Sequence, residues 1–254
     1  MRKFKNIYIN GCSFTRGHTL PVEETWPELL SNKLKLQKID QSINGQSFDS
    51  IFTNTISHLS NLDPNDTLVV IGTTWATRYS IPFGDINVNI TPGDLWNQEG
   101  GKTDFSDKLS FHRMVSPYNI ITAHVDARSK YFIGGVGNDA TQLKIGFDAV
   151  CASFTNYYKT LIKYDGSYER NQNLYLVTKL LALQAFLENN NFNYRIVDFV
   201  VPKLNPKPFI MDNIYSGDNF IHFGRKWKDK YGNGHPTKDA CIDISAVLYD
   251  SFNR

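Results

Sequence analysis

Two side chains at opposite ends of the sequence have the chemistry of an activated nucleophile and its base. Ser13 follows an apolar run, Ile7 to Ile9, and the glycine Gly11 that breaks this run. The run is typical of a buried first strand, so Ser13 lies just beyond its carboxyl end, where open α/β sheets bind ligands. A serine hydroxyl needs a positioned base to take its proton. His235, which precedes a proline and an apolar segment, is our candidate for that base.

A structural role is the alternative for both residues. Ser13 can serve as the N-cap of a helix that follows the turn. A histidine chosen at random is more often structural than catalytic, and the order of the surrounding elements is what favours His235. Five further histidines, in loops, in a predicted helix or without a following proline and helix, serve as a comparison: His18, His58, His112, His124 and His222.

The elements around these residues alternate between strands and helices. Apolar runs predict strands over 7–9, 67–72 and 194–201, and a weaker one over 36–43. Apolar periodicity and start signals at Thr25, Ser47 and Pro236 or Thr237 predict helices over 25–34, 48–59, 168–191 and 237–252. The alternation predicts a doubly wound, right-handed α/β fold, a flavodoxin-like three-layer α/β/α sandwich with a central parallel sheet.

A long insertion interrupts this alternation after the third strand. Residues from 79 to about 165 are rich in Gly, Pro, Asn, Asp and aromatic residues. A structureless loop of this length is improbable in a compact domain, so we expect small elements of its own. Covering the site and choosing the substrate is one role for it, and an oligomer contact is the other. We expect residues 1–254 to form a single domain with this elaboration.

Composition excludes several classes of protein. The 27 basic and 25 acidic residues give a net charge of only +2, which argues against nucleic acid as a partner. The three cysteines, Cys12, Cys151 and Cys241, are odd in number and far apart, as expected in a reducing compartment. Without an apolar signal or membrane segment, we expect a cytoplasmic protein and no membrane partner. The abundance of Asn and Lys indicates an AT-rich genome; if that genome is viral, we expect the protein in the virion.

Several short motifs, in their order along the chain, resemble the sequence blocks of the SGNH (GDSL-type) hydrolases. Gly11-Cys12-Ser13-Phe14-Thr15 resembles the first block, which carries the nucleophilic serine, although Cys12 stands where the family often has Asp. Gly45, after the second predicted strand, resembles the glycine of the second block. His235-Pro236 before the last helix resembles the fifth block. The resemblance implies an SGNH-hydrolase fold in which Ser13 is the nucleophile and the amides of Ser13 and Gly45 bind the oxyanion.

Two of the blocks depart from the family pattern. Thr74 falls where the third block has an asparagine that donates to the oxyanion, and its hydroxyl offers only one hydrogen. An Asn-Asp pair at Asn138 is a second candidate for that donor. Gly232 falls where the fifth block has the catalytic acid, so we favour Asp229 slightly over Asp218 for this role. A backbone carbonyl near Gly232 would instead give a Ser-His dyad.

The resemblance implies a serine esterase that cleaves a small acyl ester through an acyl-serine intermediate, with an O-acetylated carbohydrate as a plausible substrate. We expect no cofactor and no metal, because the dinucleotide, P-loop and zinc-helix motifs are absent from the sequence. Two other functions stay open at this point. One is acyl transfer to a sugar from the same site, and the other is an inactive module that binds carbohydrate or protein. The sequence leaves the oligomeric state open.

Overall fold

The core of the protein is a five-stranded parallel sheet. In the computed structural model the described residues are 4–17, 20–43, 46–74, 78–83, 86–90, 168–199, 219–223, 231–232 and 235–253. The strand order across the sheet is β2 (Gln37–Asp40), β1 (Asn6–Asn10), β3 (Thr67–Gly72), β6 (Asn193–Asp198) and β7 (Phe220–His222). Every neighbouring pair is parallel. When the five strands are numbered by their order along the chain, this order is 2-1-3-4-5, which is that of the flavodoxin-like sheets.

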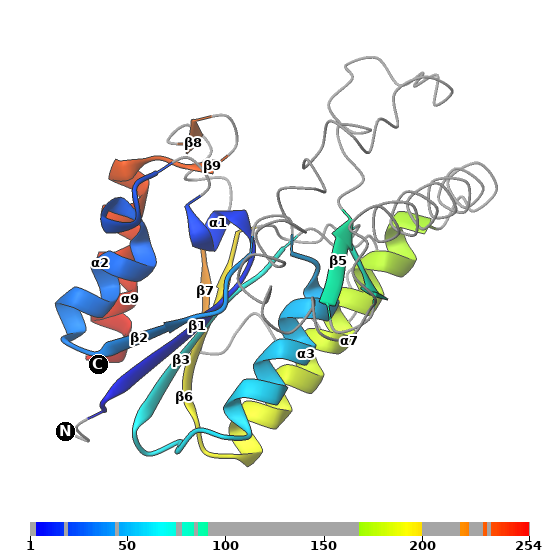
Figure 1. Cartoon of the computed structure of the whole chain (residues 1–254), viewed down its shortest axis with the longest axis horizontal. Helices are drawn as coiled ribbons and strands as arrows, with labels where there is room; N and C mark the ends of the chain where they lie inside the picture. Colours follow the sequence, from blue (N-terminus) through cyan, green and yellow to red (C-terminus); the bar gives the residue numbers. More distant parts are fainter. Residues whose placement is uncertain are drawn as a thin grey trace, which may run out of the picture.

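Helices cover both faces of the sheet, as Figure 1 shows. One face carries α2 (Trp26–Leu34) and α9 (Lys238–Phe252), which pack against each other. The other face carries α3 (Phe48–Leu59) and α7 (Tyr168–Asn189). The predicted fold class, a doubly wound three-layer α/β/α sandwich with a central parallel sheet, is therefore confirmed.

Side chains of the central strands alternate between the two cores. Ile7 and Ile9 pack with α2 and α9, whereas Tyr8 between them packs with α3 and α7. Strand β3 is buried along its whole length. A strand with helices on both faces must be apolar on both, which is why the continuous apolar run at 67–72 indicates a central strand from sequence.

The predicted N-cap hydrogen bonds are present at two helix starts and absent at the third. The hydroxyl of Ser47 accepts from the amide of Ser50 at the start of α3, and that of Thr237 accepts from Ala240 at the start of α9. Thr25 is the N-cap of α2, but its hydroxyl donates to the carbonyl oxygen of Val22 instead. The short 3₁₀ helix η1 (Val22–Glu24) brings that carbonyl within reach and so competes for the hydroxyl.

Two strand predictions need correction, and one strand was not predicted. β2 spans only Gln37–Asp40, and its burial is partial because it lies at the edge of the sheet. β6 ends at Asp198, whereas the apolar run predicted a strand to residue 201. β7, the other edge strand, has only three residues, too few for a period to be detected.

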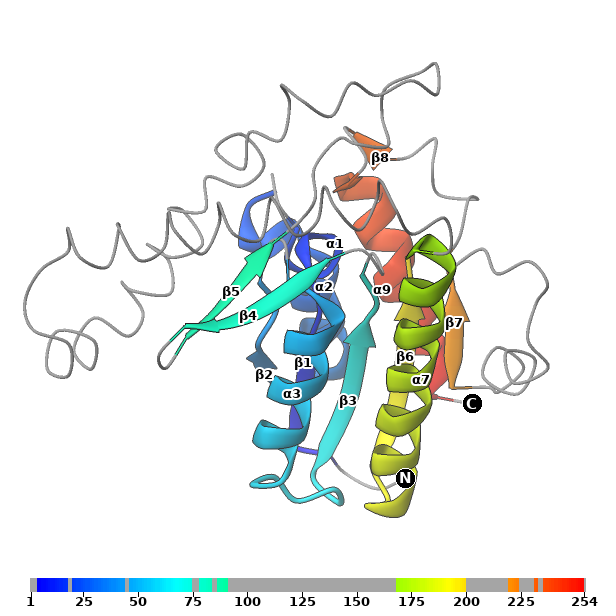
Figure 2. The ribbon, with the colours of Figure 1, turned by 90° about the vertical axis from the view of Figure 1, so that its right-hand side faces the viewer.

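The first part of the elaboration forms a β-hairpin outside the parallel sheet. β4 (Tyr79–Phe83) pairs antiparallel with β5 (Ile86–Ile90). β4 contacts α3, and Figure 2 shows the hairpin beside that helix. The remainder of the predicted elaboration lies outside the described residues. No helix in the described ranges is long and apolar enough to cross a membrane.

The ends of β1 and β3 approach each other closely at Thr15. A Cβ added to Gly11 would lie 2.1 Å from the Thr15 hydroxyl oxygen, and one added to Gly72 would lie 2.2 Å from the same atom. Thr15 is fully buried, and its hydroxyl has no hydrogen-bond partner among the described residues. Two glycines are therefore needed for the segment after β1 to sit on the end of β3.

We expect Gly72→Ala to lower the free energy of unfolding by about 3 kcal/mol, because overpacking a filled core is costly. Thr15→Ala should restore most of this loss, since the other neighbours of a Cβ at position 72 lie at 3.4 Å or more. The same change should not rescue Gly11→Ala, whose Cβ would still lie 2.8 Å from Thr15 Cβ. Urea denaturation of the variants measures each value. Rescue of both glycine variants, or of neither, would show that this contact is not the cause.

Candidate active site

The turn after β1 places Ser13 at the start of a short helix. α1 (Ser13–Arg16) begins directly beyond the carboxyl end of β1, and Figure 1 shows it above the ends of the strands. Cys12 is the N-cap residue, and no side chain caps the helix. The alternative that Ser13 serves as the N-cap is therefore wrong. Ser13 is the first helical residue, and its side chain is free for another role.

Two buried hydrogen-bonding side chains fix this turn. Asn10, at the end of β1, accepts from the Gly11 amide through Oδ1 at 2.8 Å. Its Nδ2 donates to the carbonyl of Ile51 and to the hydroxyl of Thr55 in α3. On the opposite side, Trp26 Nε1 donates to the carbonyl of Phe14 at 3.1 Å. The turn is thus attached to a helix on each face of the sheet.

His235 lies against Ser13, although 222 positions separate them in the chain. Its Nε2 is 2.9 Å from Ser13 Oγ. The histidine belongs to β9 (His235–Pro236), which pairs with β8 (Tyr231–Gly232) and leads into α9. Ser13 is only 4% exposed, so the contact is well shielded from water. The two residues chosen from sequence are therefore within hydrogen-bond distance of each other.

A row of aromatic rings supports the imidazole. The ring of Phe14 stacks on that of His235 with centroids 5.1 Å apart. Phe199 stacks on Phe14 at 5.7 Å, and Phe223 stacks on Phe199 at 6.0 Å. The three phenylalanines are buried. Stacking on a packed ring restricts the rotation of the imidazole and keeps Nε2 directed at Ser13.

The other predicted site residues divide into one that is described and several that are not. Thr74 lies two residues beyond β3, fully buried, and its hydroxyl oxygen accepts from Arg78 Nη1 at 2.7 Å. The remaining candidates lie outside the described residues: Gly45, Asn138, Asp218 and Asp229.

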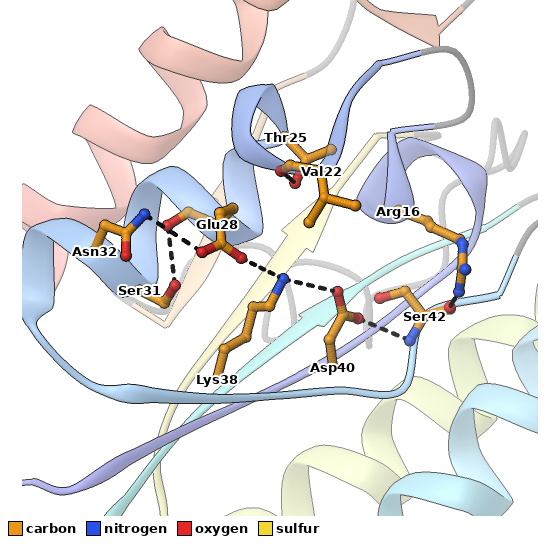
Figure 3. A network of polar contacts seen from close by, with 9 residues as sticks. All are labelled: Arg16, Val22, Thr25, Glu28, Ser31, Asn32, Lys38, Asp40 and Ser42. Atoms are coloured by element: carbon orange, nitrogen blue, oxygen red, sulfur yellow. Dashed lines mark hydrogen bonds and ion pairs between the residues drawn. The ribbon is translucent and has the colours of Figure 1, made fainter.

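The chain just before Gly45 is held beside the nucleophile turn. The amide of Ile43 donates to the carbonyl of Gly11 at 3.1 Å. Arg16 Nη1 donates to the carbonyl of Ser42 at 3.0 Å, and the Ser42 amide donates to Asp40. Figure 3 shows how this network continues from Asp40 through Lys38 to α2. The segment that leads to Gly45 therefore passes next to α1.

The described cysteines do not compete with Ser13 as nucleophiles. Cys12 adjoins Ser13 in sequence, but it is fully buried and its Sγ lies 3.6 Å from the carbonyl oxygen of Thr73. Cys241 is buried in α9, and burial raises the pKa of its thiol to about 11. A protonated thiol in a core is unreactive. Among the described residues, no group of three or more His, Cys, Asp or Glu is placed to hold a metal ion.

Sequence reasoning missed a second histidine contact at the same edge of the sheet. Asp198, 1% exposed at the end of β6, lies with Oδ2 2.9 Å from His222 Nδ1. Its Oδ1 accepts from the Thr73 hydroxyl at 2.7 Å. These bonds join the ends of β3, β6 and β7. The sequence placed Asp198 inside a strand that was predicted to continue to residue 201, so its position at a strand end had no signal.

Comparison with known proteins found similarity among solved structures alone. No family model matches the chain, and no curated protein matches it. A psychrotrophic esterase from Pseudoalteromonas sp., solved in a form inhibited by monoethylphosphonate, is 14% identical with a TM-score of 0.46, and the match covers 98% of this chain and 97% of that one.

Two further structures give similar values. A member of the lipolytic protein G-D-S-L family from Veillonella parvula is 10% identical with a TM-score of 0.47, over 98% of this chain and 99% of that one. A carbohydrate esterase with divergent catalytic and non-catalytic binding functions is 12% identical with a TM-score of 0.44, over 100% of this chain and 70% of that one. Because all three TM-scores are below 0.5, we base the function on the geometry of the residues themselves.

Proposed function

We propose that this protein is a serine hydrolase that cleaves a small acyl ester through an acyl-serine intermediate. The observation that carries the proposal is the 2.9 Å contact between Ser13 Oγ and His235 Nε2 beyond the carboxyl end of a central parallel strand. A nucleophile and a base within hydrogen-bond reach are the defining pair of such sites. The packed ring of Phe14 and the attached turn keep the pair in place before substrate binds.

The first half of the reaction forms the acyl-serine. Ser13 Oγ attacks the carbonyl carbon of the ester while His235 Nε2 takes the hydroxyl proton. The tetrahedral intermediate then collapses, the bond from carbon to the alcohol oxygen breaks, and the imidazolium gives its proton to the departing alcohol. In the second half, His235 takes a proton from water, the resulting hydroxide attacks the acyl group, and Ser13 leaves with the proton restored.

Three donors are proposed for the oxyanion that forms on the carbonyl oxygen. The amide of Ser13 is at the start of α1, where helix amides have no acceptor within the helix. The hydroxyl of Thr74 is the second donor, and the amide of Gly45 is the third. The fixed chain at Ile43 supports the assignment of Gly45. We assign Asp229 as the group that orients His235, on the basis of its position in the sequence.

The proposed substrate is a short acyl group on a carbohydrate. Support comes from the aromatic residues of the elaboration at 79–165, because aromatic side chains beside a cleft stack on sugars. No membrane or nucleic-acid partner is part of this proposal. Transfer of the acyl group to a second sugar uses the same acyl-serine, with a sugar hydroxyl in place of water.

A fluorophosphonate probe tests the proposal directly. We expect one adduct per native chain in intact-mass measurement, and peptide mapping should locate it on Ser13. The same protein unfolded in urea is the control, and it should take up none, because the base is then no longer at the serine. A folded protein without an adduct, or with the adduct at another residue, would refute the mechanism and favour a binding module.

A further inference from the structure

Arg78 makes a contact that has no role in the Ser13–His235 pair or in the parallel sheet. Arg78 directly precedes β4 in the chain, its side chain is half-buried, and Nη1 donates to Thr74 Oγ1 at 2.7 Å. Arg78 makes no ion pair with a carboxylate of the described residues. Its Nε is buried and has no hydrogen-bond partner among them. A half-buried cation without a carboxylate is costly and calls for another role.

A small hollow is lined in part by this arginine, and its two other charged side chains pair with each other. Its lining includes Arg78 together with Asp49, Tyr175 and Lys179. Asp49 and Lys179 form an ion pair with each other, and Lys179 also lies over the ring of Tyr175 at 4.3 Å. The carboxylate of this hollow is thus committed to Lys179. The charge of Arg78 is directed at Thr74.

The segment that carries Thr74 runs beside the segment that carries the nucleophile. Cys12 Sγ is 3.6 Å from the carbonyl oxygen of Thr73, and Gly11 and Gly72 both pack on Thr15. The segments after β1 and β3 therefore run side by side. One residue further along each segment are Ser13 and Thr74.

The direction of the hydrogen bond determines what the Thr74 hydroxyl can do. Arginine has donors but no acceptor, so Thr74 Oγ1 must accept in this contact. The hydroxyl hydrogen has no acceptor among the described residues, although the side chain is fully buried. A buried donor without an acceptor is costly unless a ligand supplies one. A hydroxyl that accepts from a cation is also a stronger donor, because hydrogen bonds in a chain polarise one another.

We propose that Arg78 is a positioning residue for the oxyanion: it holds the Thr74 hydroxyl so that its hydrogen is presented to the negative charge that develops beside Ser13, and it strengthens that donor. The proposal rests on the hydrolase function proposed above. The contact with Arg78 explains how a threonine hydroxyl, which has a single hydrogen to donate, can act as a strong hydrogen-bond donor to the oxyanion. Arg78 acts through Thr74 and does not itself touch the reacting atoms.

The test is a double-mutant cycle read as the rate of fluorophosphonate labelling of Ser13 and as kcat and KM for p-nitrophenyl acetate. Thr74→Val should slow labelling about 10²-fold, the usual cost of one oxyanion donor. Arg78→Met should slow it about tenfold, a part of that cost, by lowering kcat with KM unchanged. In the Thr74→Val background, Arg78→Met should have no further effect on the labelling rate. In the native background, Arg78→Lys should retain part of the native labelling rate.

The matched control is the double variant Asp49→Asn with Lys179→Met, which removes the ion pair from the same hollow without freeing a carboxylate for Arg78 and should leave the labelling rate unchanged. An equal tenfold loss with and without Thr74 would show that Arg78 acts by another route and would overturn the proposal. A rise in KM with kcat unchanged would identify a substrate-binding arginine and overturn it as well. Native labelling rates in both Arg78 variants would overturn this inference alone, whereas no labelling of the native protein would overturn the hydrolase function with it.

Discussion

Replacing Ser13 by alanine is expected to lower the rate of p-nitrophenyl acetate hydrolysis about 10⁶-fold, the usual loss when the nucleophile of a triad is removed. Among the residues that the structure describes, the hydroxyl makes one hydrogen bond, with His235 Nε2. Its loss should lower the free energy of unfolding by only about 1 kcal/mol. The fold should therefore persist while hydrolysis stops. Hydrolysis is followed by release of p-nitrophenol, and stability by thermal unfolding of the same sample.

The matched control for this change is Ser31→Ala in α2. Ser31 is also buried, at 3% exposure, and its hydroxyl donates within the helix to the carbonyl of Glu28. This variant should hydrolyse the ester at the native rate. If Ser13→Ala retained the hydrolysis and the biological function of the native chain, the acyl-serine mechanism would be excluded, and a binding module on the same fold would be the better description.

Replacing His235 by alanine is expected to slow fluorophosphonate labelling of Ser13 about 10⁴-fold, the upper range for loss of a general base. The serine stays in place in this variant, because its turn is held by Asn10 and Trp26 and not by the histidine. The probe then reacts with a hydroxyl that has no base. Added imidazole should restore part of the rate by entering the space left beside the ring of Phe14.

His222→Ala provides the matched control among the histidines. His222 pairs with Asp198 at the carboxyl ends of β7 and β6, and its side chain is 48% exposed. Its removal should leave the labelling rate within a few-fold of the native value. A large loss of labelling rate in His222→Ala, together with a small loss in His235→Ala, would show that His222 and not His235 is the base.

The parts of the fold that are coded by local patterns were predictable. The apolar run at 67–72 marks β3, and the periodicity over 168–191 marks α7, which ends at Asn189. Ser47 and Thr237 mark two helix starts because a short hydroxyl side chain satisfies amides that the helix leaves unpaired. Such patterns depend on residues close together in the sequence, so they can be recognised without knowledge of the tertiary structure.

Contacts between distant segments left little trace in the sequence. The pairing of Ser13 with His235 was inferred from the order of short motifs, since nothing in either segment alone specifies the other. The bond between Asp198 and His222 depends on where two strands end, which their apolar pattern did not reveal. The contact of Arg78 with Thr74 joins residues four apart in the chain and outside any helix of the structure, and no periodicity predicts which side chains meet there.

The distance along the chain between Ser13 and His235 also determines when the site can exist during synthesis. β1, β3 and the turn that carries Ser13 are made early, whereas the histidine follows 222 positions later. At ordinary rates of translation this interval takes about 10 to 45 s. Under the proposed mechanism, the nascent chain carries a serine without its base for that time, and we expect it to be inert toward esters. A chain stalled on the ribosome before residue 235 is expected to take up no fluorophosphonate.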